Sequence, residues 1–491
     1  VGSIAKMSSV VDAPGKISIL PFQSPQLPLD FRDQSWQRLQ AAVSSIFAKV
    51  PLRCTSKEEL CNLVEALCLN GLAPFIAERL EVECEAHIVS ALGSPSPLTE
   101  NVGVLAHLNF VWQDYCRAMV DISGLFLYFD RTYVLDQTNP SSAPLFDRGV
   151  RLFRNRFEGP QFDTAVLGML HLIDDERRGK DSQEALLCSL VSMLTKLGLY
   201  GLFEKAFLER TSLIYRIESS RLLDALLLSD YLAACERRLV EEQDRCERYL
   251  CRSTSGALSA VVQDELVRRH IAQILSGFGG CVSAHRVDDL TRLYRLLLRV
   301  GAEQDVRKTW GQAVKRLGAA ALRVEGTEEP RNVIPGLLEL RSRLHEIIAL
   351  AFQGSKNFAM TFQESFGESL NAEHQNFLAK PLARHIDEVL RNEADVRGVA
   401  KHMEGVIGIF RFVTGKDSFE GYYKEDLAKR LVQRLSSQEA EVLMLNKFKD
   451  ECGASFTSKL EGMIRDVNTS AELQNKFSCE FEVKATMEKS G

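Results

Sequence analysis

Cysteine and histidine side chains are the groups in this sequence best suited to bind a metal or attack a substrate. The chain has 12 cysteines and 9 histidines. Cys54, Cys61 and Cys68 recur at a helical spacing, whereas Cys246 and Cys251 have no histidine pair nearby. Zinc sites use closely spaced pairs, and the sequence contains no C-x-x-C and no H-x-x-x-H. We therefore expect free thiols, no metal and no cofactor.

Glycines that could hold a phosphate cluster in S-G-F-G-G at residues 276–280. Phosphate loops follow a strand and open a helix, and this cluster does neither, so we interpret it as the clearest break between helices. The acidic residues 174–176 are interpreted as a solvated helix end. The sequence contains no G-x-S-x-G nucleophile motif. An enzyme would need converging polar groups, and we expect a non-catalytic protein.

Overall charge and hydropathy exclude two further classes of partner. A formal net charge of −6 and a pI near 6.0 provide no global field for nucleic acid or an anionic membrane. The most apolar stretch, residues 222–234, is interrupted by Asp224 and Asp230 and is too polar to span a bilayer. The first residue is not Met and no signal-peptide core follows, so we expect a trimmed sequence of an intracellular protein.

Apolar residues recur at three- and four-residue steps along most of the chain, which predicts an all-α fold. Residues 56–69 form a helix opened by the capping sequence T-S-K-E-E. Residues 105–133 are apolar enough to form one long helix at the centre of its bundle. Alternating strand patterns with hairpin turns are nearly absent.

The helices fall into successive units of similar length, which suggests an elongated α-solenoid in which each unit packs on its neighbour. Before them, an extended arm contains four prolines together with apolar residues that would order on a partner. The expected divisions are the arm (1–34), three helical units (35–156, 157–280 and 281–395) and a further helical segment (396–491).

Two long motifs stand out in the last fifth of the chain. Tyr422 begins Y-Y-K-E-D-L-A-K-R-L, and Cys452 begins C-G-A-S-F-T-S-K-L-E-G-M. Both resemble motifs of the cullin family, the scaffolds of multisubunit ubiquitin ligases. F-L-E-R-T-S-L-I-Y-R-I-E-S from Phe207 and the R-R-L-V-E-E-Q-D-R helix from Arg237 are similar to the second cullin repeat. K-I-S-I-L-P-F in the arm resembles cullin 4. The resemblance implies three five-helix repeats followed by part of a four-helix bundle.

This resemblance also implies a binding site and partners. Cullins of this type hold a β-propeller damaged-DNA-binding-type adaptor with the arm and with the second and fifth helices of the first repeat, here residues 56–69 and about 105–119. The implied adaptor contacts are Ile17, Ile19, Leu20, Phe22, Lys57, Cys61, Val64, Glu65, Cys68, Asn109, Trp112, Gln113 and Cys116. We expect nuclear and cytoplasmic localisation, and no direct nucleic-acid or membrane binding.

Cullins continue into a RING-binding region and a segment modified by a ubiquitin-like protein, and from the resemblance we expect this chain to lack both. A RING partner is therefore expected only when those regions are present. Without the resemblance, a helical vesicle-tethering subunit would explain the same helical pattern and stays the alternative.

Overall fold

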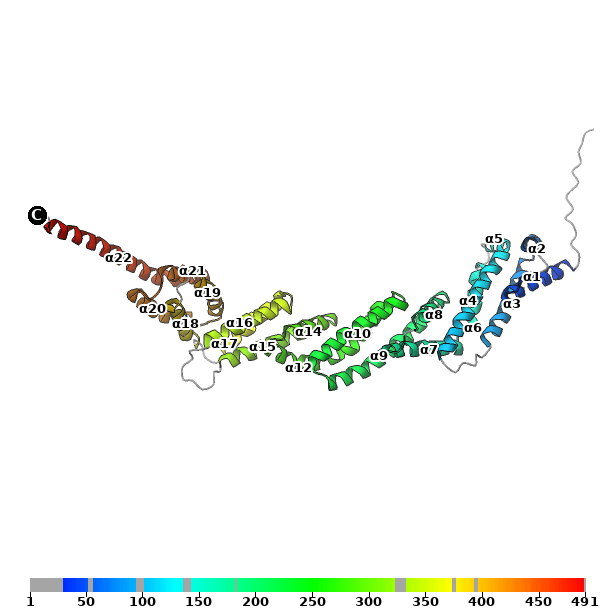
Figure 1. Cartoon of the computed structure of the whole chain (residues 1–491), viewed down its shortest axis with the longest axis horizontal. Coiled ribbons are helices and arrows are strands. Elements are labelled where there is room, and N and C mark those ends of the chain that lie inside the picture. Colours follow the sequence, from blue (N-terminus) through cyan, green and yellow to red (C-terminus); the bar gives the residue numbers. More distant parts are fainter. Residues whose placement is uncertain are drawn as a thin grey trace, which may run out of the picture. The chain divides into compact units, whose positions relative to one another are not determined.

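The computed structural model describes residues 30–51, 56–93, 101–135, 143–181, 183–322, 333–372, 377–392 and 396–489 (Figure 1). Every regular element in these ranges is a helix. No helix among the described residues combines the length and apolar character needed to cross a membrane. The chain forms two compact units, an N-terminal unit of residues 1–206 and a C-terminal unit of residues 207–491. This division does not test the predicted repeat boundaries, which stay predictions.

The N-terminal unit is built from helices α1 to α8 and the beginning of α9. Their bounds are α1 Phe31–Phe47, α2 Lys57–Leu69, α3 Ala73–Gly93, α4 Asn101–Leu125, α5 Leu127–Leu135, α6 Leu145–Phe157, α7 Pro160–Arg177, α8 Glu184–Lys196 and α9 Tyr200–Ala225.

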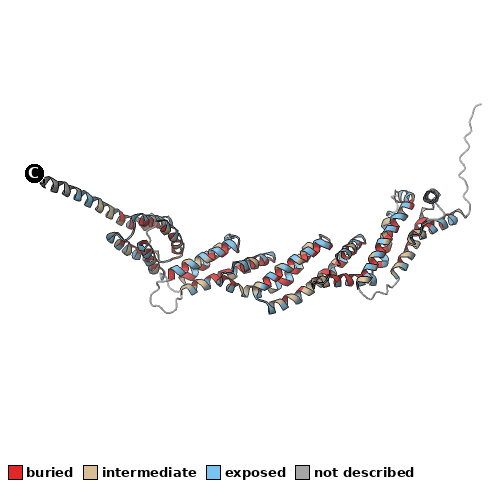
Figure 2. Cartoon of the chain, viewed as in Figure 1, coloured by how far each residue is buried: buried red, intermediate tan, exposed pale blue. Residues whose placement is uncertain are grey.

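Helix α4 is the centre of the N-terminal unit, as its apolar sequence predicted. It packs against α1, α3, α6, α7 and α8. Its buried side chains form the predicted stripe, and Figure 2 shows buried and exposed positions on opposite faces of such helices. The Tyr115 hydroxyl donates to the Gly149 carbonyl of α6 at 3.0 Å, which fixes α6 against α4.

The prediction of one helix over residues 105–133 was wrong at its C-terminal end. The helix is interrupted at Phe126, so that α4 ends at Leu125 and α5 begins at Leu127. Ser123 and Gly124 stand just before the break, and such a Ser-Gly pair is a common cause of helix kinks. The side chain of Phe126 is fully buried. Burial of this side chain anchors the joint between the two helices.

The C-terminal unit contains the rest of α9 and all later helices. Their bounds are α10 Leu228–Tyr249, α11 Thr254–Leu266, η1 Arg268–His270, α12 Ile271–Ser276, α13 Phe278–Ser283, α14 Val287–Arg299, α15 Glu303–Leu322, α16 Val333–Leu350, α17 Lys356–Asn371, α18 Ala379–Asn392, α19 Val396–Phe410, α20 Lys416–Gln433, α21 Gln438–Cys452 and α22 Ala454–Lys489.

The helices before the glycine cluster are short. Residues 254–276 are divided into α11, the 3-10 turn η1 and α12. At the division, the buried Tyr231 hydroxyl donates to the Leu266 carbonyl at 2.5 Å. That bond satisfies a carbonyl at the end of α11.

The predicted break within 276–280 is present but is confined to Gly277, since α12 ends at Ser276 and α13 begins at Phe278. The rest of the cluster is helical. A Cβ at Gly277 would lie 2.6 Å from Leu228 Cδ2, and one at Gly279 would lie 2.6 Å from Arg316 Nη2. These glycines therefore permit close packing of neighbouring side chains, not a flexible link.

The charged motif of α9 and α10 forms a partly buried network. The Tyr215 hydroxyl donates to Glu242 Oε1 at 2.5 Å, and Arg245 Nη1 donates to the same oxygen at 2.7 Å. Arg238 pairs with Glu218 of α9 at 2.7 Å and with Glu241 at 2.6 Å. The buried members of this network join α9 to α10.

The acidic run at 174–176 differs from its prediction in a similar way. Asp174 is 3% exposed and its carboxylate pairs with Arg177 at 3.3 Å, so this residue is buried. Asp175 remains at the surface, where the Lys180 ammonium lowers the pKa of its carboxyl. Asp174 therefore departs from the expected solvated helix end, whereas Asp175 fits it.

Two serine caps fix helix starts where the sequence predicted them. The Ser56 hydroxyl accepts from the Glu59 amide at 3.1 Å at the start of α2. The Ser437 hydroxyl accepts from the Ala440 amide at 3.2 Å at the start of α21. Each cap satisfies an amide that has no partner within its own helix.

Candidate protein-binding surface of the N-terminal unit

Helix α2 presents some of its predicted contact residues and hides one. Lys57 and Glu65 are exposed, and Cys61 and Cys68 are half-buried. Val64 has no exposed surface. Its assignment as an adaptor contact was therefore wrong, because its side chain lies in the core of the unit with no accessible atoms.

The predicted residues of α4 face another helix of the same unit. The Ser189 hydroxyl of α8 donates to Asn109 Oδ1 at 2.7 Å, and Gln113 Nε2 donates to the Ser189 hydroxyl at 2.9 Å. Gln113 Nε2 also approaches Asn109 Oδ1 at 3.4 Å. This polar cluster is a contact between α4 and α8.

The other two α4 residues lie in the same packed region. Trp112 is 4% exposed and meets Phe153 of α6 edge-on, with ring centroids 4.9 Å apart. Burial raises the pKa of the Cys116 thiol to about 11, against a smaller opposite effect of Lys196 of α8. The assignment of Trp112 as an adaptor contact is therefore wrong, because its side chain is buried against α6. Asn109 and Cys116 are half-buried and Gln113 is exposed, so their assignment stays a prediction.

The fifth helix of the chain is α5, and it is the helix that packs against α2. The Cys61 thiol donates to the Leu125 carbonyl at 3.6 Å, at the junction of α4 and α5. Burial raises the pKa of the Cys68 thiol, and a hydrogen bond with Thr132 of α5 opposes that rise. Both cysteines thus hold α2 against the α4–α5 junction and α5.

Together these helices present an accessible surface, which we call the α2–α5 surface. Leu127 is 48% exposed, and Arg131 and Thr132 are also exposed. The surface mixes one apolar side chain with charges of both signs. Its members are Lys57, Cys61, Glu65, Cys68, Leu127, Arg131 and Thr132. The three α5 members were missed because residues 105–119 were taken as the fifth helix.

A groove adjoins this surface between α1, α2 and α4, with a volume near 530 Å³. Lys49 lies on its rim, pairs with Asp114 at 2.7 Å and stands over the Phe110 ring at 5.0 Å. Lys57 and Arg117 also line the groove. The side chain of Phe110 is 60% exposed, so an apolar ring is accessible beside the groove. Sequence reasoning missed the groove because its walls come from three separate helices.

The four predicted arm contacts, Ile17, Ile19, Leu20 and Phe22, lie outside the described residues. Within the described ranges, no group of three His, Cys, Asp or Glu side chains is arranged to hold a metal ion. The buried thiols of Cys84 and Cys235 have their pKa raised to about 12 by burial. They are protonated at neutral pH and poor nucleophiles.

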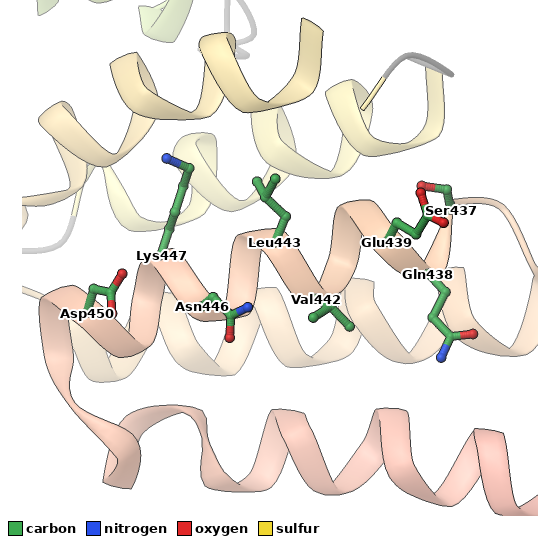
Figure 3. A pocket seen from close by; sticks show the side chains of 8 residues that line it. All are labelled: Ser437, Gln438, Glu439, Val442, Leu443, Asn446, Lys447 and Asp450. Carbon is green, nitrogen blue, oxygen red and sulfur yellow. The ribbon is translucent and has the colours of Figure 1, made fainter. Parts of the chain in front are cut away.

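The C-terminal unit carries an open cleft of about 1000 Å³ along α21 (Figure 3). Its lining combines Val442, which is 42% exposed, with polar side chains such as Asn446 and Asp450. Lys447 of the same lining reaches Glu404 of α19 at 3.8 Å. The cleft brings together no set of groups arranged for catalysis.

Comparison with known proteins decides the family. Residues 36–474 match the cullin alpha solenoid domain. The chain belongs to the cullin family. This cullin is 35% identical to human Cullin-4A over 92% of its own length and 60% of the relative's length. It is 33% identical to Dictyostelium discoideum Cullin-4 over 93% of its length and 57% of the relative, and 30% identical to Arabidopsis thaliana Cullin-3A over 91% and 62%.

The cullin match confirms the predicted α-solenoid fold class and the resemblance to cullin 4, since identity to these Cullin-4 proteins exceeds identity to Cullin-3A. The family match also rules out the alternative that the chain is a helical vesicle-tethering subunit. The chain spans about three fifths of the length of these relatives.

Proposed function

We propose that this cullin is a non-catalytic scaffold of a ubiquitin ligase that binds a β-propeller adaptor of the damaged-DNA-binding type. The observation that carries the proposal is the cullin match over residues 36–474, with higher identity to Cullin-4 relatives than to Cullin-3A. The adaptor site is assigned to the α2–α5 surface, with the arm of residues 1–34 adding a second contact. The protein is expected in the nucleus and cytoplasm.

The chemistry of the α2–α5 surface supports this assignment. Both Arg131 and Leu127 can contribute to a protein interface. Arg131 can form several hydrogen bonds with a partner, and Leu127 offers an apolar side chain for burial. The underlying Cys61 and Cys68 contacts hold α2 against α5. A preorganised surface loses less conformational entropy when it binds.

The role of a scaffold also requires internal stiffness, since a floppy tether dilutes the local concentration of a distant reaction partner. Packing within each unit supports this requirement. In the C-terminal unit, α15 and α17 approach so closely that a Cβ on Gly311 would lie 2.9 Å from Ser365 Oγ. RING capture would belong to a chain that also carries the remaining portion of the relatives' length.

An adaptor pull-down with matched charge reversals tests the site. The chain is incubated with a β-propeller adaptor, a BTB adaptor or a Skp-like adaptor. We expect only the first to be retained, and its Kd to rise at least about tenfold in Arg131→Glu. The control Glu78→Lys reverses an exposed charge on α3 and should change the Kd by less than about twofold.

Removing residues 1–34 separates the arm from the helical surface. We expect weaker adaptor binding in the truncated chain, and complete loss when the truncation is combined with Arg131→Glu. Retention of a BTB or Skp-like protein in place of the propeller adaptor would reassign the adaptor class. Equal effects of Arg131→Glu and Glu78→Lys would remove the α2–α5 surface from the proposal.

A further inference from the structure

A cleft of about 710 Å³ in the C-terminal unit is lined by cationic and imidazole side chains and by no carboxylate. Helix α16 contributes Arg341, Ser342 and His345 to this cleft, and α19 contributes Lys401 and His402. The two helices pack against each other, and both contact α18. We infer that this α16–α19 cleft is a binding site for a small oligophosphate anion.

Arg341 is the first reason for this inference. Its side chain is half-buried, and its Nε is enclosed without a hydrogen-bond partner. No ion pair joins Arg341 to a carboxylate among the described residues. Buried cations are normally paired, because an unpaired charge loses hydration without compensation. A bound anion would supply the missing acceptor, and the planar guanidinium matches phosphate oxygens well.

Helix α19 is shaped to receive Arg341. A Cβ at Gly408 would lie 2.4 Å from the guanidinium carbon of Arg341, so the side chain lies directly against the α19 backbone at this glycine. Any larger residue at 408 would displace the guanidinium. The position of the cation at the cleft is therefore determined by a residue on the opposite helix.

The surrounding charges leave the cleft cationic. Lys401 is exposed and also makes no ion pair with a described carboxylate. Glu339 of α16 and Glu388 of α18 do not line the cleft. The other carboxylates on the three helices are engaged by cations outside the lining, Glu346 by His285, Asp387 by Arg430 and Glu404 by Lys447.

The size and lining of the cleft favour a small anion over a protein segment. Its volume falls within the range typical of small-molecule sites, roughly 300–1,000 Å³. Protein partners usually anchor through buried aromatic or aliphatic side chains, whereas Leu338 is the single large apolar side chain of this lining. Imidazole and hydroxyl donors from His345, His402 and Ser342 suit a ligand with many phosphate oxygens.

Calorimetric titration of the full chain with inorganic tripolyphosphate, in metal-free buffer at low ionic strength, tests the site. We expect one binding site per chain. Arg341→Met and Lys401→Met should each weaken binding by at least about tenfold, because each removes a charge-assisted contact. Arg343→Met is the matched control: it removes the same charge two residues along α16, where Arg343 donates to the Ser283 carbonyl at the surface. It should change affinity by less than about twofold.

A second variant keeps every charge in place. Gly408→Ala should weaken binding by several-fold because its methyl group displaces Arg341, while alanine favours the helix and preserves the fold. Circular dichroism confirms that each variant is folded. The inference is overturned if the parent chain binds no tripolyphosphate at about 1 mM, or if Arg343→Met weakens binding as much as Arg341→Met. Arg341-dependent binding of a polyglutamate peptide without tripolyphosphate binding would also overturn it.

Discussion

Arg430 and Glu441 form a fully buried ion pair that joins α20 to α21. Neither side chain is exposed, and Arg430 Nε and Nη2 donate to the two carboxylate oxygens at 2.6 and 3.1 Å. Arg430 Nη1 reaches Asp387 of α18 at 2.8 Å, and the Tyr423 hydroxyl donates to Glu441 at 3.3 Å. Tyr423 and Arg430 both belong to the motif that first indicated the family, so part of this motif serves packing within the molecule.

Removing Arg430 should destabilise the C-terminal unit strongly. Arg430→Met leaves the Glu441 carboxylate buried without its cation, and we expect the free energy of unfolding to fall by about 3–5 kcal/mol. Urea denaturation followed by circular dichroism measures this change. Lys429→Met, at an exposed neighbour that pairs with Asp426, should cost less than about 0.5 kcal/mol. A loss below about 1 kcal/mol in Arg430→Met would show that the pair is dispensable.

Two helical glycines differ in the space around them, so replacing each with alanine should have opposite effects on stability. A Cβ on Gly318 would lie 2.1 Å from Ser369 Oγ, so Gly318→Ala should destabilise the unit by about 1–3 kcal/mol through overpacking. Gly336 of α16 has no neighbour within 4 Å, so Gly336→Ala should stabilise by up to about 1 kcal/mol. Thermal unfolding measures both. Failure of Ser369→Gly to restore stability to Gly318→Ala would contradict this explanation.

The α4–α8 contact predicts a structural and not a binding role for Gln113. Gln113→Ala removes the hydrogen bond to Ser189 and should lower the free energy of unfolding of the N-terminal unit by about 0.5–1.5 kcal/mol. Adaptor affinity should stay within about twofold of the parent chain, because the Gln113 amide is engaged by Ser189 of α8. Surface plasmon resonance and urea denaturation measure the two effects. A large loss of adaptor affinity with unchanged stability would restore the original assignment of Gln113 to the binding site.

A histidine pair makes stability sensitive to acid. His385 and His402 approach with their Nε2 atoms 2.9 Å apart, and burial, aided by His402, lowers the pKa of His385 to about 4. The folded state therefore binds fewer protons than the unfolded state, whose His pKa is about 6.5, and stability is lost as pH falls through that interval. The loss should be about 1–2 kcal/mol, allowing for solvent screening.

Urea denaturation at pH 7 and pH 5 measures this effect before most carboxylates titrate. His385→Gln should reduce the difference between the two pH values. The half-buried His87 and His345 also have pKa values lowered by burial and leave a residual slope of the same sign. An unchanged slope in His385→Gln would assign the acid sensitivity to these other histidines.

The sequence was sufficient to predict the all-α fold class, the family and many of the buried residues. Helical periodicity and capping residues are local properties of the sequence. The apolar stripe along α4 and the caps at Ser56 and Ser437 could therefore be predicted from neighbouring residues alone. The break at Phe126 was missed although the Ser123–Gly124 pair is a local signal. The division at Val267 could not be predicted, because the Tyr231 hydroxyl that satisfies the Leu266 carbonyl comes from another helix. The close packing at Gly277 and Gly279 was missed for the same reason, since a glycine in a loop and one under a packed side chain look alike in sequence.

Local periodicity by itself established which side of each helix carries a given set of residues, and so grouped Asn109, Trp112, Gln113 and Cys116 correctly on one face of α4. Only the tertiary structure decided that Trp112 is buried against α6, that Asn109 and Gln113 contact α8, and that α5 lies beside α2. Helical period depends on backbone geometry between residues a few positions apart. Coverage depends on which distant segment packs there, as Ser189 does 80 residues beyond Asn109.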